Sequence, residues 1–378
     1  MMFFLRGYHM KIKVYYGPRK AFDEILPKGI RPKTLTKLVE ISDHERHNFY
    51  VDYPNKTKEN RKKRRFKNVI ATTEEYALLS DSGLNGLITL LDEFSIGNIY
   101  FQNPPSSVVS QLEEVYKKID RGNYSYENIQ TKTLKIFANK FTSEILGQET
   151  AKKKLLVNLY QLAKNYNKGK PIVLMLYGPA GVGKTETAKL LSSVLGQHLF
   201  RKQFSMFHTN SFADYIFGAS HNSSSLSRDL LERESNVILF DEFDKPNNMF
   251  YSAFYQMFDE GKFEDKNYQA NLKNSIIFCT SNFTNEGQIK RVLGDAIYSR
   301  FDAFIEYKAL TKEVVNQLIS KSFNKLINSL DNDDRKRIDE QQCLKVLLSH
   351  SSNLQNAREL DKFVNEYVFT RILKAIFS

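Results

Sequence analysis

The residues from Gly178 to Thr185 form a pattern that binds phosphate. They read GPAGVGKT and fit G-x-x-x-x-G-K-[ST], in which glycines let successive backbone N–H groups turn toward an anion. Lys184 adds a positive charge, and Thr185 offers a hydroxyl to Mg²⁺ at the start of the next helix. The run IVLMLY before the loop is typical of a buried strand, and TETAKLLSSVLG after it of an amphipathic helix. This order predicts a site for ATP and Mg²⁺. The loop residues expected to contact the nucleotide are Gly178, Pro179, Ala180, Gly181, Val182, Gly183, Lys184, Thr185 and Glu186.

Two adjacent carboxylates follow a second buried strand. Asp241 and Glu242 come directly after the apolar run NVILF, and packing alone does not explain two acids at a strand end. We expect Asp241 to hold Mg²⁺ through water. We expect Glu242 to orient and polarise the water that attacks the γ-phosphate. The alternative is a solvated acidic turn.

A third strand is expected at Ser275–Cys279, followed by Thr280, Ser281 and Asn282. Three buried strands in this order predict a parallel sheet with its site at the carboxyl ends of the strands. Asn282 would then lie between the phosphate loop and the acids, where it can bond the γ-phosphate or the attacking water. An Asn after a strand is otherwise a common turn residue.

Together these motifs resemble the AAA+ ATPases, and FDEFDK resembles the acidic motif of the Clp-type unfoldases in particular. The resemblance covers roughly residues 141–378. It implies an α/β fold with an AAA+ parallel-sheet P-loop ATPase core, a C-terminal α-helical lid and a preceding small α/β domain. It also implies a ring, a homohexamer, with a nucleotide at each subunit interface.

Three further segments carry residue roles that the resemblance implies. EILGQETAKKKL places Ile145, Leu146 and Gly147 in an adenine pocket. YSRFDAFIEYKAL places Arg300 at the subunit boundary as an arginine finger that reaches a neighbour's γ-phosphate. NARELDKFV, in the lid, places Arg358 on phosphate within the same subunit. Without the resemblance, both arginines would be ordinary surface residues.

Two features depart from the unfoldases. Their aromatic loop, usually a Gly-Tyr-Val-Gly-like run, grips the polypeptide, whereas Phe217–Leu231 has small polar residues at His221–Ser225. Tyr215 and Phe217 lie nearby, but we expect both to pack in the core. A long insertion with an Ile-Gly-Phe or Ile-Gly-Leu tip, which docks on a barrel peptidase, is missing ahead of Arg300. A Clp-like peptidase is therefore not an expected partner.

The first 130 residues are expected to select a protein partner, although they resemble no family that we recognise. KIKVYY, NVIATT and NIYFQNPP have strand character, and Thr73–Phe94 and Ser106–Ile119 have helical apolar spacing. Asp120–Gln130 has the composition of a linker, and the segment TKTLKIFANKF after it is expected to be helical. The expected domains are an N-terminal α/β domain at 1–130, the large ATPase subdomain at 131–308 and the helical lid at 309–378.

The 378-residue chain has a formal net charge of +12, which favours anionic partners. Its densest basic cluster, Lys58–Lys67, could bind nucleic-acid phosphate, a nucleotide or an acidic protein surface, or could be a solvated hairpin after a candidate strand HNFYVDY.

Cys279 and Cys343 are expected to be reduced structural thiols. The apolar opening is too short and too soon interrupted by Arg6 for a signal peptide. The sequence also has no run of about 18 apolar residues, the length that a membrane-spanning helix needs. We therefore expect a cytoplasmic protein without a membrane partner.

Three hypotheses for the biological role share ATP hydrolysis. The leading one is a ring that remodels or disassembles a protein partner without processive threading. The second is a nucleic-acid-associated ATPase, such as a loader or a transposition or phage-defence component, in which Lys58–Lys67 contacts DNA or RNA. The third is a regulatory switch whose nucleotide-gated assembly is itself the signal.

Overall fold

The computed structural model of the protein describes residues 10–29, 31–47, 63–206, 209–351 and 356–377. The chain forms two compact units, and each combines segments that are distant in sequence. The first unit comprises 1–126, 207–234 and 262–272, and the second comprises 127–206, 235–261 and 273–378. The contiguous domain ranges expected from the sequence stay a prediction.

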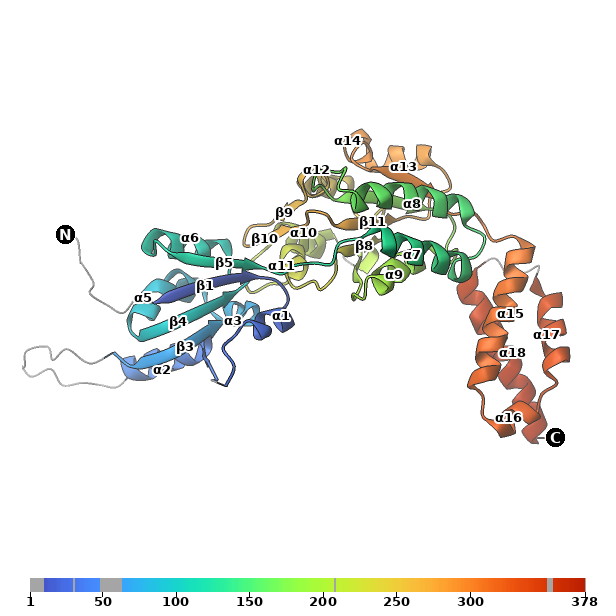
Figure 1. The fold of residues 1–378 in the computed structure, drawn as a ribbon, viewed down its shortest axis with the longest axis horizontal. Helices are drawn as coiled ribbons and strands as arrows, with labels where there is room; N and C mark the ends of the chain where they lie inside the picture. Colours follow the sequence, from blue (N-terminus) through green and yellow to red (C-terminus); the bar gives the residue numbers. More distant parts are fainter. Residues whose placement is uncertain (1–9, 30, 48–62, 207–208, 352–355, 378) are drawn as a thin grey trace, which may run out of the picture. The chain divides into compact units, whose positions relative to one another are not determined.

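The first unit has a five-stranded parallel sheet with helices on both faces (Figure 1). Its strands, in spatial order, are β2 (Lys33–Thr34), β3 (Arg65–Ala71), β4 (Ser95–Gln102), β1 (Lys11–Tyr16) and β5 (Ile119–Asn123). Its N-terminal helices are α1 (Arg19–Glu24), α2 (Leu35–His47), α3 (Thr73–Leu78), α4 (Asp81–Asn85), α5 (Leu87–Asp92) and α6 (Ser106–Val115). Buried side chains of α2, α5 and α6 pack against Val14 and Phe101 on one face of the sheet. Phe22 of α1 packs against Tyr15 and Ile70 on the other face.

The predicted strands β1, β3 and β4 are present, but β5 was missed. Helix α6 ends at Val115, before the predicted end, and Ile119 pairs with Ile12 of β1. The residues IDRGN of β5 have no apolar alternation of their own. They form a strand because the backbone groups of β1 are available for pairing beside them, which no local pattern reveals.

The helical segment predicted at Thr73–Phe94 consists of three short helices, α3, α4 and α5. The Ser80 side chain accepts a hydrogen bond from the backbone N–H of Gly83 and thereby caps the start of α4. Gly86 ends α4 and precedes α5. Apolar spacing was therefore read correctly as helical, whereas the two breaks follow from capping.

Half of the basic cluster Lys58–Lys67, residues 58–62, lies outside the described residues, as does the candidate strand HNFYVDY after its first residue. The described end of the cluster belongs to β3, from Arg65 onward. Phe66 is 8% exposed and packs against Phe94, with ring centroids 5.5 Å apart. Its ring is therefore part of the core and does not offer a surface for base stacking.

Segments from the middle of the chain complete the first unit. They form α10 (Thr209–Phe217), α11 (Leu226–Leu231) and the antiparallel pair β9 (Lys262–Glu264) and β10 (Gln269–Asn271). Directly after α11, the Glu232 carboxylate accepts hydrogen bonds from the Arg19 backbone N–H at 3.0 Å and the Thr73 hydroxyl at 2.5 Å. It also accepts bonds from the side-chain amides of Gln102 at 2.9 Å and Asn103 at 2.8 Å. Four donors at the carboxyl edge of the N-terminal sheet thus converge on one carboxylate. Burial raises the pKa of Glu232, while the bonds from Thr73, Asn103 and Arg19 lower it.

The next residue, Arg233, strengthens the same attachment. It is 4% exposed, and its guanidinium donates to the carbonyl oxygens of Leu230 and Asn271, each at 2.6 Å. The guanidinium carbon also lies 4.1 Å from the ring centroid of Tyr126. Two consecutive charged residues thus fix the segment 207–234 within the first unit.

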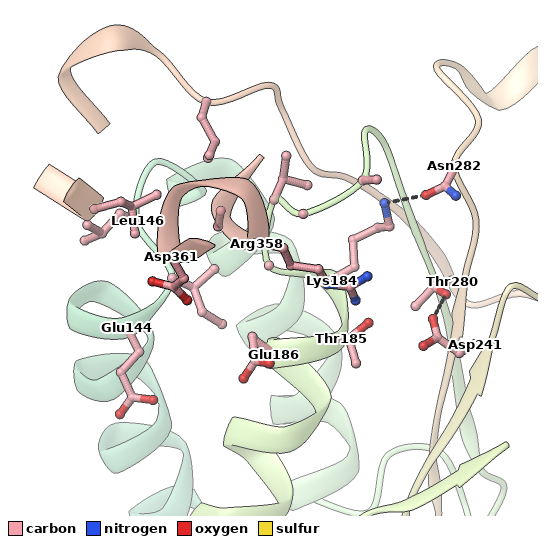
Figure 2. A pocket seen from close by; sticks show the side chains of 18 of the residues that line it. Glu144, Leu146, Lys184, Thr185, Glu186, Asp241, Thr280, Asn282, Arg358 and Asp361 are labelled. Atoms are coloured by element: carbon pink, nitrogen blue, oxygen red, sulfur yellow. Dashed lines mark hydrogen bonds between the residues drawn. The ribbon is translucent and has the colours of Figure 1, made fainter. Parts of the chain in front are cut away.

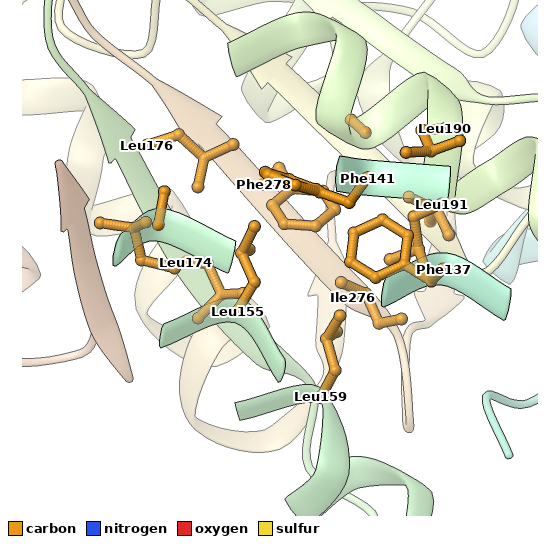
Figure 3. Close-up of a cluster of buried hydrophobic side chains, with 14 of the residues drawn as sticks. Phe137, Phe141, Leu155, Leu159, Leu174, Leu176, Leu190, Leu191, Ile276 and Phe278 are labelled. Atoms are coloured by element: carbon orange, nitrogen blue, oxygen red, sulfur yellow. The ribbon is translucent and has the colours of Figure 1, made fainter. Parts of the chain in front are cut away.

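The second unit is built on another five-stranded parallel sheet, with helices packed against it (Figure 1). Its strands, in spatial order, are β12 (Ala303–Glu306), β6 (Ile172–Tyr177), β11 (Ile276–Thr280), β8 (Val237–Asp241) and β7 (Phe200–Gln203). Its other elements before β12 are α7 (Thr131–Glu144), α8 (Glu149–Ala163), α9 (Lys184–Val194), η1 (Phe204–Met206), η2 (Asn248–Phe254), α12 (Tyr255–Glu260), α13 (Glu286–Leu293) and α14 (Asp295–Tyr298). Figure 3 shows Phe137 and Phe141 of α7 among side chains of the central strands, including Phe278.

Four helices follow the second sheet. They are α15 (Lys312–Ser329), α16 (Asn332–Lys336), α17 (Glu340–Ser349) and α18 (Ala357–Phe377). Helices α15, α17 and α18 share a core that includes Ile319, Leu347 and Val364. The predicted α/β fold class, with parallel sheets and a helical C-terminal part, is confirmed.

The remaining composition-based expectations concern the cysteines and the membrane. Cys279 on β11 and Cys343 on α17 are free and buried, as expected, and burial raises the pKa of both thiols. Within the described ranges, none of the helices has the length and apolar character needed to span a bilayer.

The Glu232 cluster gives a test of stability. Replacing Glu232 with Ala removes the carboxylate acceptor of the buried amides of Gln102 and Asn103, which then keep only weaker bonds such as those to the Gly17 carbonyl oxygen. We therefore expect the first unit to lose about 2 kcal/mol of unfolding free energy. Urea denaturation followed by circular dichroism measures this loss. Glu234→Ala, two residues away and outside the cluster, is the matched control and should leave the transition in place. Equal stability of the two variants would contradict the anchoring role of Glu232.

Candidate nucleotide site

A pocket of about 340 Å³ lies at the carboxyl edge of the second sheet. It collects side chains from the end of α7, the loop before α9, strands β7, β8 and β11, and the C-terminal helices (Figure 2). The predicted residues that line it are Ile145, Leu146, Ala180, Gly181, Val182, Gly183, Lys184, Thr185, Glu186, Asp241, Glu242, Asn282 and Arg358. Sequence-distant motifs thus meet in one place.

The loop before α9 requires its glycines. Gly178, Gly181 and Gly183 have φ values of 130°, 74° and 109°, in the region that disfavours side chains. A Cβ atom at Gly178 would lie 2.1 Å from the carbonyl oxygen of Tyr307, and one at Gly181 would lie 1.9 Å from Oδ1 of Asn356. Only glycine fits there, and the loop leads into the N-terminus of α9, where backbone N–H groups favour an anion.

Lys184 is the first residue of α9 and is 7% exposed. Its ammonium donates to the carbonyl oxygens of Gly178 and Pro179, each at 2.6 Å, and to Oδ1 of Asn282 at 3.1 Å. Burial lowers the pKa of Lys184 to about 8, while the negative charges of Asp241 and Asp244 raise it. Gly178 and Pro179 therefore contact the lysine through their carbonyl groups and are not among the side chains that line the pocket.

The two predicted acids are held by Thr280, at the end of the neighbouring strand. The Thr280 hydroxyl donates to Oδ1 of Asp241 and accepts a hydrogen bond from the backbone N–H of Glu242 at 3.0 Å. The Thr280 carbonyl oxygen accepts from the backbone N–H of Phe243 at 2.9 Å. Glu242 has φ = 56°, which is uncommon for a residue other than glycine, and these bonds hold it there. Figure 2 shows Asp241 and Thr280 together at one side of the pocket.

The C-terminal helices close the pocket from the other side. The backbone N–H of Ala357 donates to the carbonyl oxygen of Gly181 at 3.2 Å, so the start of α18 contacts the glycine-rich loop directly. Arg358 follows, and its positive charge lowers the pKa of Lys184, although burial has the larger effect. Ile145 and Leu146 line the pocket as predicted. Gly147 does not line it and instead lies against Val314, which a Cβ atom would approach to 2.9 Å.

Comparison with known proteins agrees with this geometry. A family model described as AAA domain (Cdc48 subfamily) matches residues 170–332, which include the loop, the acids and Asn282. The chain carries an AAA+ ATPase module of the Clp type. This finding confirms the resemblance that the motifs indicated.

Relatives of this AAA+ module include the ATP-dependent Clp protease ATP-binding subunit ClpL of Staphylococcus aureus strains USA300, NCTC 8325 and MRSA252. Each is 28% identical over 222 residues, which cover 52% of this chain and 32% of the relative. The chain thus spans about a third of the length of these relatives.

Arg300 lies outside the pocket of its own AAA+ module. Its Nε donates to Asp259 at 2.8 Å, and an Nη donates to the carbonyl oxygen of Ala296 at 2.5 Å. Its guanidinium carbon lies 4.1 Å from the ring centroid of Tyr255. Arg300 is therefore held on the surface of the unit by α12 and α14, and its predicted role as an arginine finger stays a prediction.

Three pocket residues that contact the two acids were not assigned a role from the sequence. Thr280 was noted only as a strand end, although its hydroxyl contacts both acids. Arg201 of β7 forms an ion pair with Asp241 at 2.5 Å, and Gln203 donates to Glu242 at 3.3 Å. Knowledge of the strand order would have pointed to these residues. Strands β11 and β7 pair with β8 on either side, so residues near their carboxyl ends lie beside the acids. The segment FRKQ gives no indication that it is such a strand.

The segment that departs from the unfoldase loop lies within the first unit. His221 is 6% exposed, its Nε2 lies 2.9 Å from the carbonyl oxygen of Leu79, and its Nδ1 lies 2.9 Å from Asp81. Tyr215 is buried as expected and bonds Asp229 at 2.6 Å. The expectation that Phe217 packs in the core was wrong, because it is 47% exposed at the end of α10, just before Gly218 turns the chain.

The donor set of the pocket fits a nucleotide with its metal ion. The glycine cradle, the N-terminus of α9 and Lys184 supply positive potential for phosphate groups. Asp241 and the Thr185 hydroxyl are hard oxygen ligands of the kind Mg²⁺ takes, directly or through water. The AAA+ module therefore has the groups that a magnesium–nucleotide complex requires.

Thr280 gives a test of how the acids are held. Thr280→Val keeps the shape but removes the hydroxyl, so the Asp241 carboxylate and the Glu242 backbone N–H lose a shared partner. We expect ATP turnover to fall by about tenfold, equivalent to ~1.4 kcal/mol in the barrier, with nucleotide affinity nearly unchanged. Phosphate release and equilibrium binding measure the two quantities.

The matched control for this experiment is Thr280→Ser, which retains the hydroxyl and should keep turnover close to that of the natural protein. If the Val and Ser variants hydrolysed ATP equally fast, the hydroxyl would have no part in holding the acids.

Proposed function

We propose that this chain hydrolyses ATP with Mg²⁺, assembles as a homohexameric ring, and remodels or disassembles a protein partner that the first unit selects. The observation that supports the ATPase part most strongly is the meeting of Lys184, Asn282 and the Asp241–Thr280–Glu242 cluster in one pocket. These groups approach the same cavity from three different elements.

Each group has a role that follows from its chemistry. Lys184 and the N–H groups of the glycine-rich loop bind the phosphates, and Asn282 bonds the γ-phosphate or the attacking water. Thr185 and Asp241 hold the metal ion, which when bound neutralises charge on the phosphate oxygens. Glu242 orients the water and takes its proton. Arg358 contacts phosphate from the lid, and Ile145 with Leu146 contacts the adenine. Gly147 lies against Val314 and is not among the residues that line the pocket.

Arg300 completes the site of a neighbouring copy in this proposal. Its position outside its own pocket supports a role in trans, because a guanidinium on the surface of one subunit can reach the phosphate of the next. A ring provides that arrangement through a repeated heterologous interface. Asp259 and Tyr255 hold the guanidinium in a defined position until it is engaged.

The role in protein remodelling rests on two supports. The relatives are named as ATP-binding subunits of an ATP-dependent protease, which favours a protein as the object of the work. The segment at 217–231 is fixed within the first unit through His221, which contacts Leu79 just after α3 and Asp81 of α4, and Glu232 and Arg233 extend this attachment. Small polar residues occupy His221–Ser225, where the unfoldases carry their aromatic residue, and the exposed Phe217 lies before this run. This favours pulling or disassembly over processive threading, without a Clp-like peptidase.

A trap experiment tests the proposal. Glu242→Gln should bind ATP and fail to hydrolyse it, with turnover reduced by on the order of 100-fold or more, because the general base is lost. Purified from its native host with ATP, this variant should retain one protein partner in stoichiometric amount. Lys184→Ala, which cannot hold the phosphates, is the matched control and should retain none.

Nuclease treatment separates the competing roles. Capture of a protein that survives nuclease supports remodelling. Nucleic acid that copurifies, and is lost when Arg61–Arg65 is neutralised, would replace it with the nucleic-acid-associated ATPase. An oligomer that changes with nucleotide and captures nothing would favour the regulatory switch.

A further inference from the structure

The ion pair between Arg201 and Asp241 occupies the carboxylate that the proposed function assigns to the metal ion. Oδ2 of Asp241 accepts hydrogen bonds from Nη2 of Arg201 at 2.5 Å and from Nε at 3.1 Å. The other oxygen, Oδ1, accepts the Thr280 hydroxyl. Both oxygens of the carboxylate are therefore engaged, and one of them by a fork of two charged donors.

A hydrated Mg²⁺ ion needs the same carboxylate. An aspartate that holds this ion does so by binding it directly or by accepting a hydrogen bond from one of its water ligands, and Oδ2 already accepts two bonds from Arg201. A divalent cation beside Asp241 would also repel a guanidinium a few ångströms away. The two cations thus cannot both use this oxygen.

The two partners differ in their freedom to move. The Arg201 side chain is 37% exposed and lines the pocket, whereas that of Asp241 is only 10% exposed. Asp241 is also fixed by Thr280 and by its place at the end of β8. If the pair separates, Arg201 is the partner that moves.

We propose that Arg201 is a positioning residue that competes with Mg²⁺ for Asp241, and that metal-nucleotide binding releases its guanidinium toward the phosphate groups. This inference rests on the proposed function, because it assigns nucleotide and metal to this pocket. The guanidinium has five N–H donors, and its planar fork matches phosphate oxygens. Arg201 thereby keeps Asp241 oriented and sets the Mg²⁺ concentration at which the site loads.

The neighbouring residue offers a matched control. Lys202 carries the same charge on the same strand, but it does not line the pocket, and its ammonium lies 5.6 Å from the ring centroid of Phe200. Removing this charge changes the net charge of the protein as much as removing that of Arg201. Removing the Lys202 charge leaves the Asp241 carboxylate bonded to Arg201 and Thr280.

Binding of a fluorescent ADP to the full chain, measured in EDTA and over a series of Mg²⁺ concentrations, tests the competition without requiring hydrolysis. In Arg201→Met, the Mg²⁺ concentration that gives half of the Mg²⁺-dependent change in ADP binding should fall by about tenfold. The reason is that the cation competing for Asp241 is gone. Arg201→Lys, which retains a cation but not the fork, should lie between Arg201→Met and the natural protein. Lys202→Met should match the natural protein.

The outcomes separate the inference from the proposed function. A natural protein that binds ADP with Mg²⁺, together with an Arg201→Met midpoint that is unchanged or higher, would overturn the competition and leave the ATPase proposal intact. A natural protein that binds no ADP at any Mg²⁺ concentration would overturn both. Binding in EDTA also reports that each variant is folded, so a lower midpoint in a variant that binds ADP in EDTA supports the competition.

Discussion

The register between β8 and β11 is the constraint on which the site depends. Phe278 pairs with Leu239 and Cys279 with Phe240, so the next residues along the two strands are Thr280 and Asp241. This register lets one hydroxyl hold the Asp241 carboxylate and the backbone of the adjacent Glu242. A slip of one residue would turn every side chain of the strand to the opposite face and separate these groups. The apolar core around both strands therefore fixes the chemistry as well as the fold.

Much of the AAA+ module could be predicted because its signals are local. Lys184 could be assigned from a glycine-rich loop between an apolar run and an amphipathic helix, and Asp241 from its place after a second apolar run. Neither assignment requires the tertiary structure. Thr280 and Arg201 could not be assigned in this way, because their roles arise from pairing between strands that are distant in sequence. Strand β5 was missed for the same reason. The error at Phe217 arose because its place at the end of an apolar helical segment does not show which side of the helix end is exposed.

The composition of the first unit carries a functional consequence. The segment 207–234 belongs to this unit, yet the same stretch of chain continues into β8, which ends at Asp241. Glu232 and Arg233, shortly before β8, are fixed by partly buried hydrogen bonds to Asn103 and Asn271. Buried, hydrogen-bonded charges resist displacement because an unpaired partner is costly. The chain therefore provides a short covalent path between the N-terminal sheet and Asp241 and Glu242.

We expect Arg300 of one copy to complete the nucleotide site of another, and mixing two inactive variants tests this arrangement most directly. Glu242→Gln lacks the general base but supplies Arg300, whereas Arg300→Ala lacks the finger but retains the base. We expect each alone to hydrolyse ATP poorly while still binding it. An equimolar mixture should regain roughly a quarter of the natural turnover, because random assembly in a ring pairs an intact site with an intact finger at that frequency. A mixture no more active than the average of its components, or full turnover by Arg300→Ala alone, would contradict the account.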